Sequence, residues 1–228
     1  MTKEAHEILN KLLRGNKKYQ KNCQEVFEDL KSGQSPKVTL LTCGDSRVPA
    51  SIFGIDALNE IFTVKNIGNQ IRISEGSLKY PILHLKTPIV IILGHTGCGA
   101  IKAATSDYRK EDDAIQRELI GLKNSILRAQ HEIKKDVSDE LLKQCMISEI
   151  NVDHQIDKLL LDYNIKPKIE NQEVVLIGMM FDIHDIYEKG CAKIFITNIN
   201  GNRDVDKINT HPVLKLFSEK EDVVKRLT

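Results

Sequence analysis

The stretch Ile89–Gly99, IVIILGHTGCG, decides the fold. Its residues 89–93 are apolar and predict a strand that is buried on both faces. His95 and Cys98 follow in a turn that contains glycine, and residues 100–104 then read as helix. A histidine and a cysteine therefore stand where a buried strand passes into a helix, which is the edge at which open α/β folds bind ligands.

A second stretch has the same construction. Residues 38–42 form another apolar, β-rich run, and CGDSR (43–47) follows it. If the two runs are neighbouring parallel strands, Cys43, His95 and Cys98 meet at one edge of the sheet. Two thiolates and one imidazole suit zinc, and three protein ligands leave the fourth tetrahedral position for water, as in catalytic zinc sites.

The role of Asp45 has two interpretations. Because it lies two residues after Cys43, its carboxylate could become the fourth metal ligand and close the site. Arg47 offers it another partner, because a guanidinium can hold a carboxylate in a bidentate pair. The residues alone leave both interpretations open.

CGDSR followed by HTGCG resembles the β-class carbonic anhydrases, whose hallmark is Cys-x-Asp-x-Arg and a later His-x-x-Cys. The similarity extends to residues 33–36, 60–69, 77–86 and 178–182, and it is thinnest from about Ser106 to Met146. Alternating strand and helix patterns also predict an α/β fold. We expect a central, mostly parallel sheet of four to five strands flanked by helices, as one domain over 1–228 with an N-terminal helical arm at about 1–32.

The resemblance implies one Zn²⁺ per chain, bound by Cys43, His95 and Cys98. The implied reaction is the reversible hydration of CO2 to bicarbonate and a proton by attack of zinc hydroxide, with Asp45 and Arg47 as catalytic residues. The predicted substrate-binding residues are Gln34, Phe62, Ile67, Tyr80 and Gly99, and His84 is the candidate proton shuttle. Since the pocket residues match the family members that do not switch, we predict an open site with Asp45 paired to Arg47 near neutral pH, and Asp45 as a ligand only in a closed form.

Three alternatives compete with this interpretation. Some relatives on the same scaffold hydrolyse carbonyl sulfide or carbon disulfide, and the motifs do not distinguish them. A structural zinc module would use Asp45 as a permanent ligand, but such a ligand needs no restraint by Arg47. A cysteine-based redox protein is disfavoured because the sequence has no C-x-x-C.

Composition narrows the choice of partners and compartment. The net charge of +1 gives no reason to expect nucleic acid or a membrane surface as a partner. There is no apolar run of membrane-spanning length and no signal-peptide core, so we expect a soluble, cytoplasmic protein. Five cysteines do not suggest a disulfide framework, and Cys23, Cys145 and Cys191 are expected to be buried thiols.

Helical periodicity accounts for much of the remaining chain. Residues 3–22 predict an amphipathic helix that covers either a partner subunit or its own domain. Two helices with a break near 136–138, followed by another helix over 151–161, are predicted for the region where the resemblance is thinnest. The resemblance implies self-association as a dimer or larger, in which Phe62 and Tyr80 serve the neighbouring chain's zinc.

Overall fold

A computed structural model describes residues 2–134 and 136–228, which form two compact units, Met1–Ser35 and Pro36–Thr228. The first unit is dominated by helix α1, Lys3–Leu30, whose N-terminus is capped by the Thr2 hydroxyl. Among the described residues of α1 none is buried, and its large apolar side chains are 42–64% exposed. The amphipathic helix predicted over 3–22 is therefore present and longer than expected.

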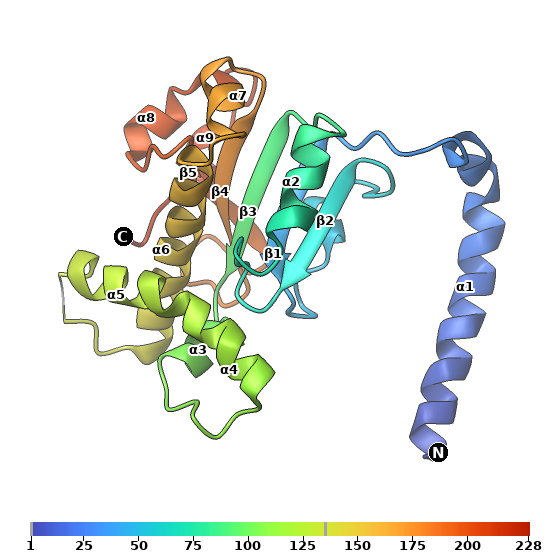
Figure 1. Ribbon diagram of the computed structural model, residues 1–228, viewed down its shortest axis with the longest axis horizontal. Coiled ribbons are helices and arrows are strands. Elements are labelled where there is room, and N and C mark those ends of the chain that lie inside the picture. Colours follow the sequence, from blue (N-terminus) through green and yellow to red (C-terminus); the bar gives the residue numbers. More distant parts are fainter. Residues whose placement is uncertain (1, 135) are drawn as a thin grey trace. The chain divides into compact units, whose positions relative to one another are not determined.

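One sheet organises the second unit, and over the described residues it has five strands in the order β2-β1-β3-β4-β5 (Figure 1). The strands are β1 (Val38–Cys43), β2 (Ile61–Asn66), β3 (Ile89–His95), β4 (Val175–Asp182) and β5 (Lys193–Ile199). The first four are mutually parallel, and β5 runs antiparallel to β4 at one edge. The predicted α/β class and the mostly parallel sheet are confirmed.

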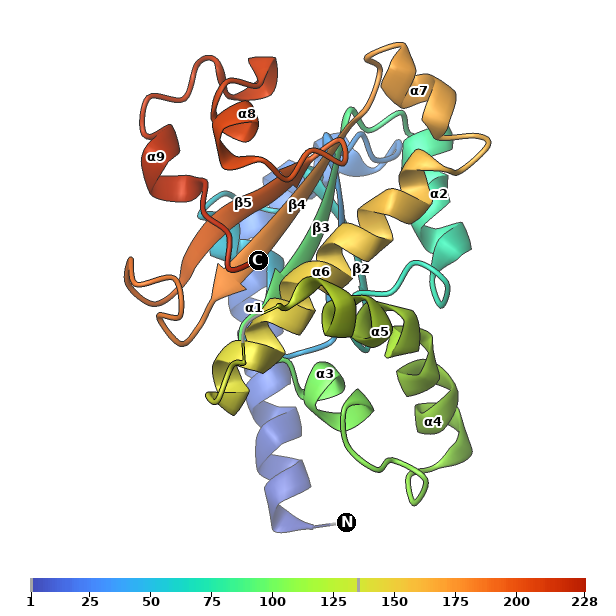
Figure 2. The ribbon, with the colours of Figure 1, turned by 90° about the vertical axis from the view of Figure 1, so that its left-hand side faces the viewer.

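Helices cover both faces of this sheet. On one face, α2 (Glu75–Leu83) and α6 (Glu140–Leu160) pack on apolar residues of all five strands, as Figure 2 shows for α6. The opposite face is covered by the 3-10 turns η1 (Ala50–Phe53) and η3 (Pro212–Leu214) and by α8 (Val205–Asn209). Two further short helices are α7 (Lys166–Glu170) and α9 (Lys220–Val223). The strands are thus buried on both sides, as parallel sheets require.

Helix α6 approaches the sheet closely because glycine lies beneath it. A Cβ atom added at Gly178 on β4 would lie 2.9 Å from both Ile156 Cδ1 and Val152 Cγ1 of α6. Such distances are shorter than normal carbon–carbon contacts. The absent side chain at this position therefore sets the distance between α6 and the sheet.

A third apolar cluster lies beyond the end of the sheet. It is built by α3 (Gly99–Ala104), the turn η2 (Ile120–Leu122) and the helices α4 (Asp113–Leu119) and α5 (Lys123–Glu132), with the first half of α6. Cys43 and Cys98 belong to this cluster. The region of thinnest resemblance therefore packs next to the predicted ligands.

Several sequence predictions are wrong in detail here. The region predicted to hold two helices contains α4, α5 and the start of α6, and α6 continues through Asn151, where a new helix was expected to begin. Cys145 is buried as expected, but Cys23 is half-buried and Cys191 is exposed.

Over the described residues, no helix combines the length and the apolar character needed to span a membrane.

Charged side chains tie the end of the chain to α6. Arg226 is almost fully buried, and its Nη2 atom lies 2.8 Å from Asp153 Oδ2 and 3.3 Å from Glu149 Oε1. Both carboxyl groups are fully buried. The Glu149 carboxylate also accepts hydrogen bonds from the Tyr187 hydroxyl, at 2.6 Å, and from the backbone N–H of Thr228, at 3.0 Å. Ion pairs and hydrogen bonds therefore hold these buried groups together inside the core.

Candidate metal centre

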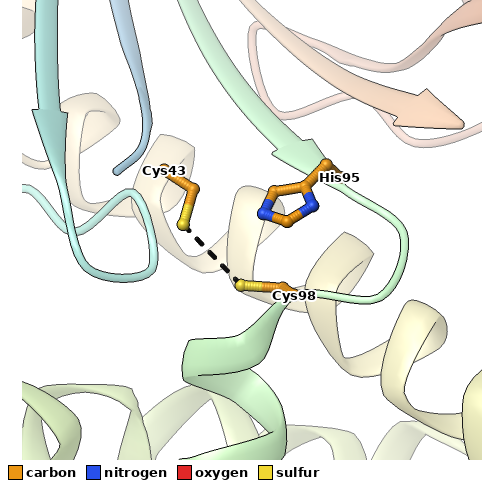
Figure 3. A group of neighbouring side chains, drawn as sticks. All are labelled: Cys43, His95 and Cys98. Carbon is orange, nitrogen blue, oxygen red and sulfur yellow. Dashed lines mark hydrogen bonds between the residues drawn. The ribbon is translucent and has the colours of Figure 1, made fainter. Parts of the chain in front are cut away.

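Two strand ends and one helix start bring the predicted metal ligands together. Cys43 is the last residue of β1, His95 is the last residue of β3, and Cys98 directly precedes α3. Because β1 and β3 are parallel neighbours, their carboxyl ends lie at the same edge of the sheet. Figure 3 shows the two sulfur atoms pointing toward one another with the imidazole beside them. The cluster follows directly from the two apolar runs and the turn after β3.

The donor atoms of the cluster fit a tetrahedral zinc ion. The Sγ atoms of Cys43 and Cys98 are 3.9 Å apart, and the three residues are buried with their donor atoms within 4.8 Å of one another. Zinc–sulfur bonds of about 2.3 Å at the tetrahedral angle would separate two sulfurs by about 3.8 Å. His95 Nδ1 meets the Thr96 carbonyl oxygen at 3.0 Å, whereas Nε2 is buried and has no hydrogen-bond partner among the described residues. Nε2 is therefore the nitrogen available to a metal.

The surroundings favour the ionised form of one thiol. The neighbouring Cys98 thiol, the His95 ring and backbone groups including that of Gly68 lower the pKa of Cys43 to about 4, although burial opposes this. The pKa of Cys98 is raised well above its ordinary value, because its proton is held by Cys43 and because it is buried. The two sulfurs thus share one proton. A bound dication would displace that proton and stabilise both thiolates.

Asp45 lies beside these donors and is held by Arg47. Arg47 donates from Nε to Asp45 Oδ1 at 3.0 Å and from Nη2 to Oδ2 at 2.7 Å. These hydrogen bonds keep the pKa of the Asp45 carboxyl well below its usual range. Asp45 Oδ2 also lies 3.8 Å from His95 Nε2, so the carboxylate borders the space in front of the free nitrogen.

A cavity of about 420 Å³ opens beside the cluster. Its lining includes Cys43, Asp45, and two of the predicted substrate-binding residues, Ile67 and Gly99. The opposite wall comes from α3 and from the segment that continues into α4, and it includes Glu111 and Ile115. The cavity therefore joins the donor cluster to a mainly apolar surface.

Comparison with known proteins places the chain in a family. The family model described as carbonic anhydrase matches residues 38–187, a range that includes both motifs of the cluster. A structure of a tetrameric β-carbonic anhydrase from Sordaria macrospora is 25% identical, with a TM-score of 0.72 over 86% of this chain and 97% of that chain. The chain belongs to the β-carbonic anhydrase family.

Other family members show how the similarity is distributed. The carbonic anhydrase of Saccharomyces cerevisiae is 27% identical over 161 residues, which cover 67% of this chain and 72% of that protein. The carbonic anhydrase of Mycolicibacterium smegmatis is 40% identical over 78 residues, which cover 34% of this chain and 38% of that protein. The β-carbonic anhydrase of Coccomyxa, solved with acetazolamide, shares the fold, with a TM-score of 0.71 at 19% identity over 88% of this chain and 90% of that chain. Similarity to β-carbonic anhydrases thus covers most of the chain in fold and concentrates in shorter stretches in sequence.

Other predicted site residues of this β-carbonic anhydrase are not among the residues that line this cavity. Phe62 on β2 and Tyr80 on α2 have ring centroids 6.2 Å apart, and the His84 ring lies 5.3 Å from Tyr80. Tyr80 is 47% exposed, and His84 is also exposed. Gln34 is an exposed residue of the N-terminal unit. Their roles in substrate binding and proton transfer stay predictions.

Sequence reasoning missed the second wall of the cavity. Glu111 and Ile115 lie in the region of thinnest resemblance, for which helices but no site residues were predicted. The apolar residue Ile115 within a charged helix was the one available signal, and it is 37% exposed. An exposed isoleucine on a helix is too common at protein surfaces to indicate a site by itself.

Proposed function

We propose that this β-carbonic anhydrase catalyses the reversible hydration of CO2 to bicarbonate and a proton, with one Zn²⁺ held by Cys43, His95 and Cys98. The observation that supports this most is the buried set of three donors whose imidazole Nε2 has no hydrogen-bond partner among the described residues. When bound, zinc lowers the pKa of a coordinated water molecule and so supplies a nucleophile near neutral pH.

Asp45 would orient that nucleophile. Its carboxylate stays ionised because Arg47 stabilises the charged form, so it acts only as a hydrogen-bond acceptor. It would accept a hydrogen bond from a protonated oxygen in front of His95 and leave the oxygen lone pair directed at the substrate. The two hydrogen bonds from Arg47 would prevent the Asp45 carboxylate from rotating toward the metal. A permanent ligand role for Asp45 in a structural zinc module fits poorly with both of its oxygens being engaged by Arg47.

The cavity suits a small neutral substrate. CO2 carries no charge and gains from an apolar wall, which Ile67 would supply with Phe62 and Tyr80 of the same or a neighbouring chain. The developing bicarbonate would receive hydrogen bonds from the Gly99 backbone N–H and from Gln34. His84 is the proposed carrier of the released proton, because imidazole titrates near neutral pH.

Zinc content and CO2 hydration measured on one purified sample test this proposal. We expect one zinc per chain and hydration activity that both disappear in the Cys43→Ser variant. A folded, active, metal-free protein would overturn the proposal. Turnover of CO2, carbonyl sulfide and carbon disulfide, measured on the same preparation, distinguishes a carbonic anhydrase from a carbonyl sulfide or carbon disulfide hydrolase on this scaffold.

We further propose self-association, because the relative from Sordaria macrospora is tetrameric and because Tyr80 leaves about half of its side chain uncovered. Light scattering coupled to size-exclusion chromatography measures the size of the assembly. A reducing compartment such as the cytoplasm would suit a site built from two free thiols.

A further inference from the structure

The turn between the two ligands of β3 and α3 is fixed by groups outside the metal centre. Thr96 follows His95 directly, and its backbone N–H donates to the Phe181 carbonyl at 3.0 Å. Its hydroxyl receives the Ile183 N–H at 2.8 Å. The same hydroxyl lies 3.2 Å from Asp182 Oδ1 and 3.0 Å from His184 Nδ1. Thr96 is thus attached to the end of β4 by both backbone and side chain.

The chemistry of these partners determines the direction of each hydrogen bond. Asp182 is fully buried and accepts backbone N–H bonds from His184 at 3.1 Å and from Tyr187 at 2.8 Å. Its carboxylate offers only acceptors, so the single Thr96 hydroxyl proton is donated to Asp182. His184 Nδ1 must then carry a proton and donate it to the Thr96 oxygen. The hydroxyl is thereby fully satisfied, and its orientation is fixed.

The next residue, Gly97, is held from three sides. It has a φ of +64°, and a Cβ atom there would lie 2.4 Å from His184 Cε1, so the imidazole packs directly on its backbone. Its carbonyl accepts a hydrogen bond from Arg47 Nη2 at 3.2 Å. Its backbone also hydrogen-bonds the thiol of the buried Cys145 on α6. The turn between His95 and Cys98 is therefore fixed in its backbone as well as at Thr96.

The consequence reaches the metal ligand through the Thr96 carbonyl. That oxygen lies 3.0 Å from His95 Nδ1, and this contact leaves Nε2 as the ring nitrogen that is free to bind a metal. We propose that Asp182 and His184 are positioning residues of the metal centre, which act through Thr96 to fix the direction of the His95 imidazole and the spacing of His95 and Cys98. This inference rests on the proposed zinc site, and it assigns a function to the polar end of β4 that the reaction itself does not require.

Substitutions that remove one side-chain group at a time test this role. Thr96→Val removes the hydroxyl at nearly constant volume, and Thr96→Ser keeps it. His184→Ala removes the exposed imidazole at little risk to folding, and His184→Asn keeps an N–H donor near the position of Nδ1. The matched control is Thr39→Val, because Thr39 is also buried and hydrogen-bonded, to Thr87 at 2.6 Å, but lies at the other end of β1.

The readouts are the affinity of the metal-depleted protein for Zn²⁺, by competition with a chelator, and the absorption spectrum of the Co²⁺ form. We expect Thr96→Val to weaken Zn²⁺ binding about 10–100-fold and His184→Ala about tenfold, with shifted Co²⁺ bands, because partners of metal ligands tune affinity to this extent. Thr96→Ser, His184→Asn and Thr39→Val should keep the wild-type spectrum and affinity.

Wild-type affinity and spectrum in both Thr96→Val and His184→Ala would overturn the inference while leaving the proposed function intact. Equal weakening in Thr39→Val would also overturn it, since the effect would then be a general loss of stability. A wild-type protein that binds no Zn²⁺ would overturn the proposed function itself, and with it the positioning role.

Discussion

Arg47 and Asp45 show how much one residue depends on its neighbour for its chemistry. The same Asp-x-Arg spacing recurs at Asp107 and Arg109, where Nε and Nη2 donate to the carboxylate at 2.8 and 2.7 Å. That second pair is exposed and does not belong to the cluster of candidate metal ligands found among the described residues. The bidentate pair therefore follows from the Asp-x-Arg spacing alone. The neighbouring donor cluster is what gives the Asp45–Arg47 pair its proposed function.

Asp45→Asn tests this difference. The amide keeps the shape of the side chain but loses the charge and offers an N–H where an acceptor is needed, so we expect CO2 turnover to fall about 100-fold or more. Zinc content should stay at the wild-type level. Asp107→Asn is the matched control and should leave turnover unchanged. Parallel loss of zinc and activity in Asp45→Asn would show that the carboxylate is a metal ligand instead.

At the scale of elements, helix α6 combines an apolar face with buried polar residues. Besides Val152 and Ile156 it buries Asn151 and Gln155. Gln155 Oε1 accepts the Ile71 N–H at 3.0 Å, and Asn151 Nδ2 donates to the Gly68 carbonyl at 3.0 Å. These amides hold the loop that carries Ile67 and that donates a hydrogen bond to the Cys43 sulfur. The helix thus supports the site through hydrogen bonds as well as apolar packing.

The same residues explain what the sequence could and could not predict. The strands β1 and β3 were predicted from apolar, β-rich runs, and their ligands from the residues that follow those runs. Helix α6 was divided at Asn151 because a polar residue in a buried position interrupts the apolar periodicity. Only the tertiary partners of these amides, which lie far away in the sequence, reveal that the positions are buried.

The close packing of α6 on β4 predicts the effect of Gly178→Ala. The added methyl group would overlap Ile156 and Val152, so we expect the free energy of unfolding to fall by about 1–3 kcal/mol. Gly76→Ala in α2 is the matched control, because no atom lies within 4 Å of its added Cβ, and it should be neutral or slightly stabilising. Urea unfolding of both variants measures this, and equal stability of the two would contradict the packing argument.

Helix α6 also carries a histidine that makes the free energy of unfolding depend on pH. Burial lowers the pKa of His154 from its ordinary 6.5 to about 4, and the charges of Lys158 and Arg128 act in the same direction. The unfolded chain therefore takes up a proton before the native state does, so stability is lost as the pH falls from about 6.5 to about 4.

His154→Gln should remove part of this loss. We expect the difference in unfolding free energy between about pH 7 and about pH 5 to be smaller in the variant than in the wild type. His131→Gln on the exposed surface of α5 is the control and should leave that difference unchanged. An identical pH dependence in wild type and His154→Gln would contradict the assignment.

At the scale of the whole molecule, Arg226 joins the end of the chain to the centre of the fold. It forms ion pairs with two fully buried carboxyl groups of α6 and donates to the Thr197 carbonyl of β5 at 2.5 Å. Val224 also forms a bridge to Ile196 of the same strand. The antiparallel edge strand is therefore held between β4 and the last residues of the chain.

Arg226→Ala would leave the buried Glu149 without its cation and would leave Asp153 with only Arg203, whose Nε lies 3.4 Å from Asp153 Oδ2. We expect a loss of about 3–5 kcal/mol in the free energy of unfolding, because an unpaired charge in the interior is costly. Arg109→Ala, which removes a surface ion pair, should leave that free energy unchanged within error. A loss in Arg226→Ala no larger than in Arg109→Ala would show that the buried carboxyl groups are satisfied in another way.

The pairing of β1 with β3 has a consequence for how the protein matures. Thr42 lies opposite Leu93, and Cys43 continues the same strand toward the end of β3. Successive side chains of a strand point to opposite faces, so a slip of one residue would send the Cys43 sulfur to the wrong side of the sheet. Zinc binding would then stabilise only the correct register of these two strands, which are far apart in the sequence. A fluorescent zinc indicator, followed during refolding, would report when that alignment is reached.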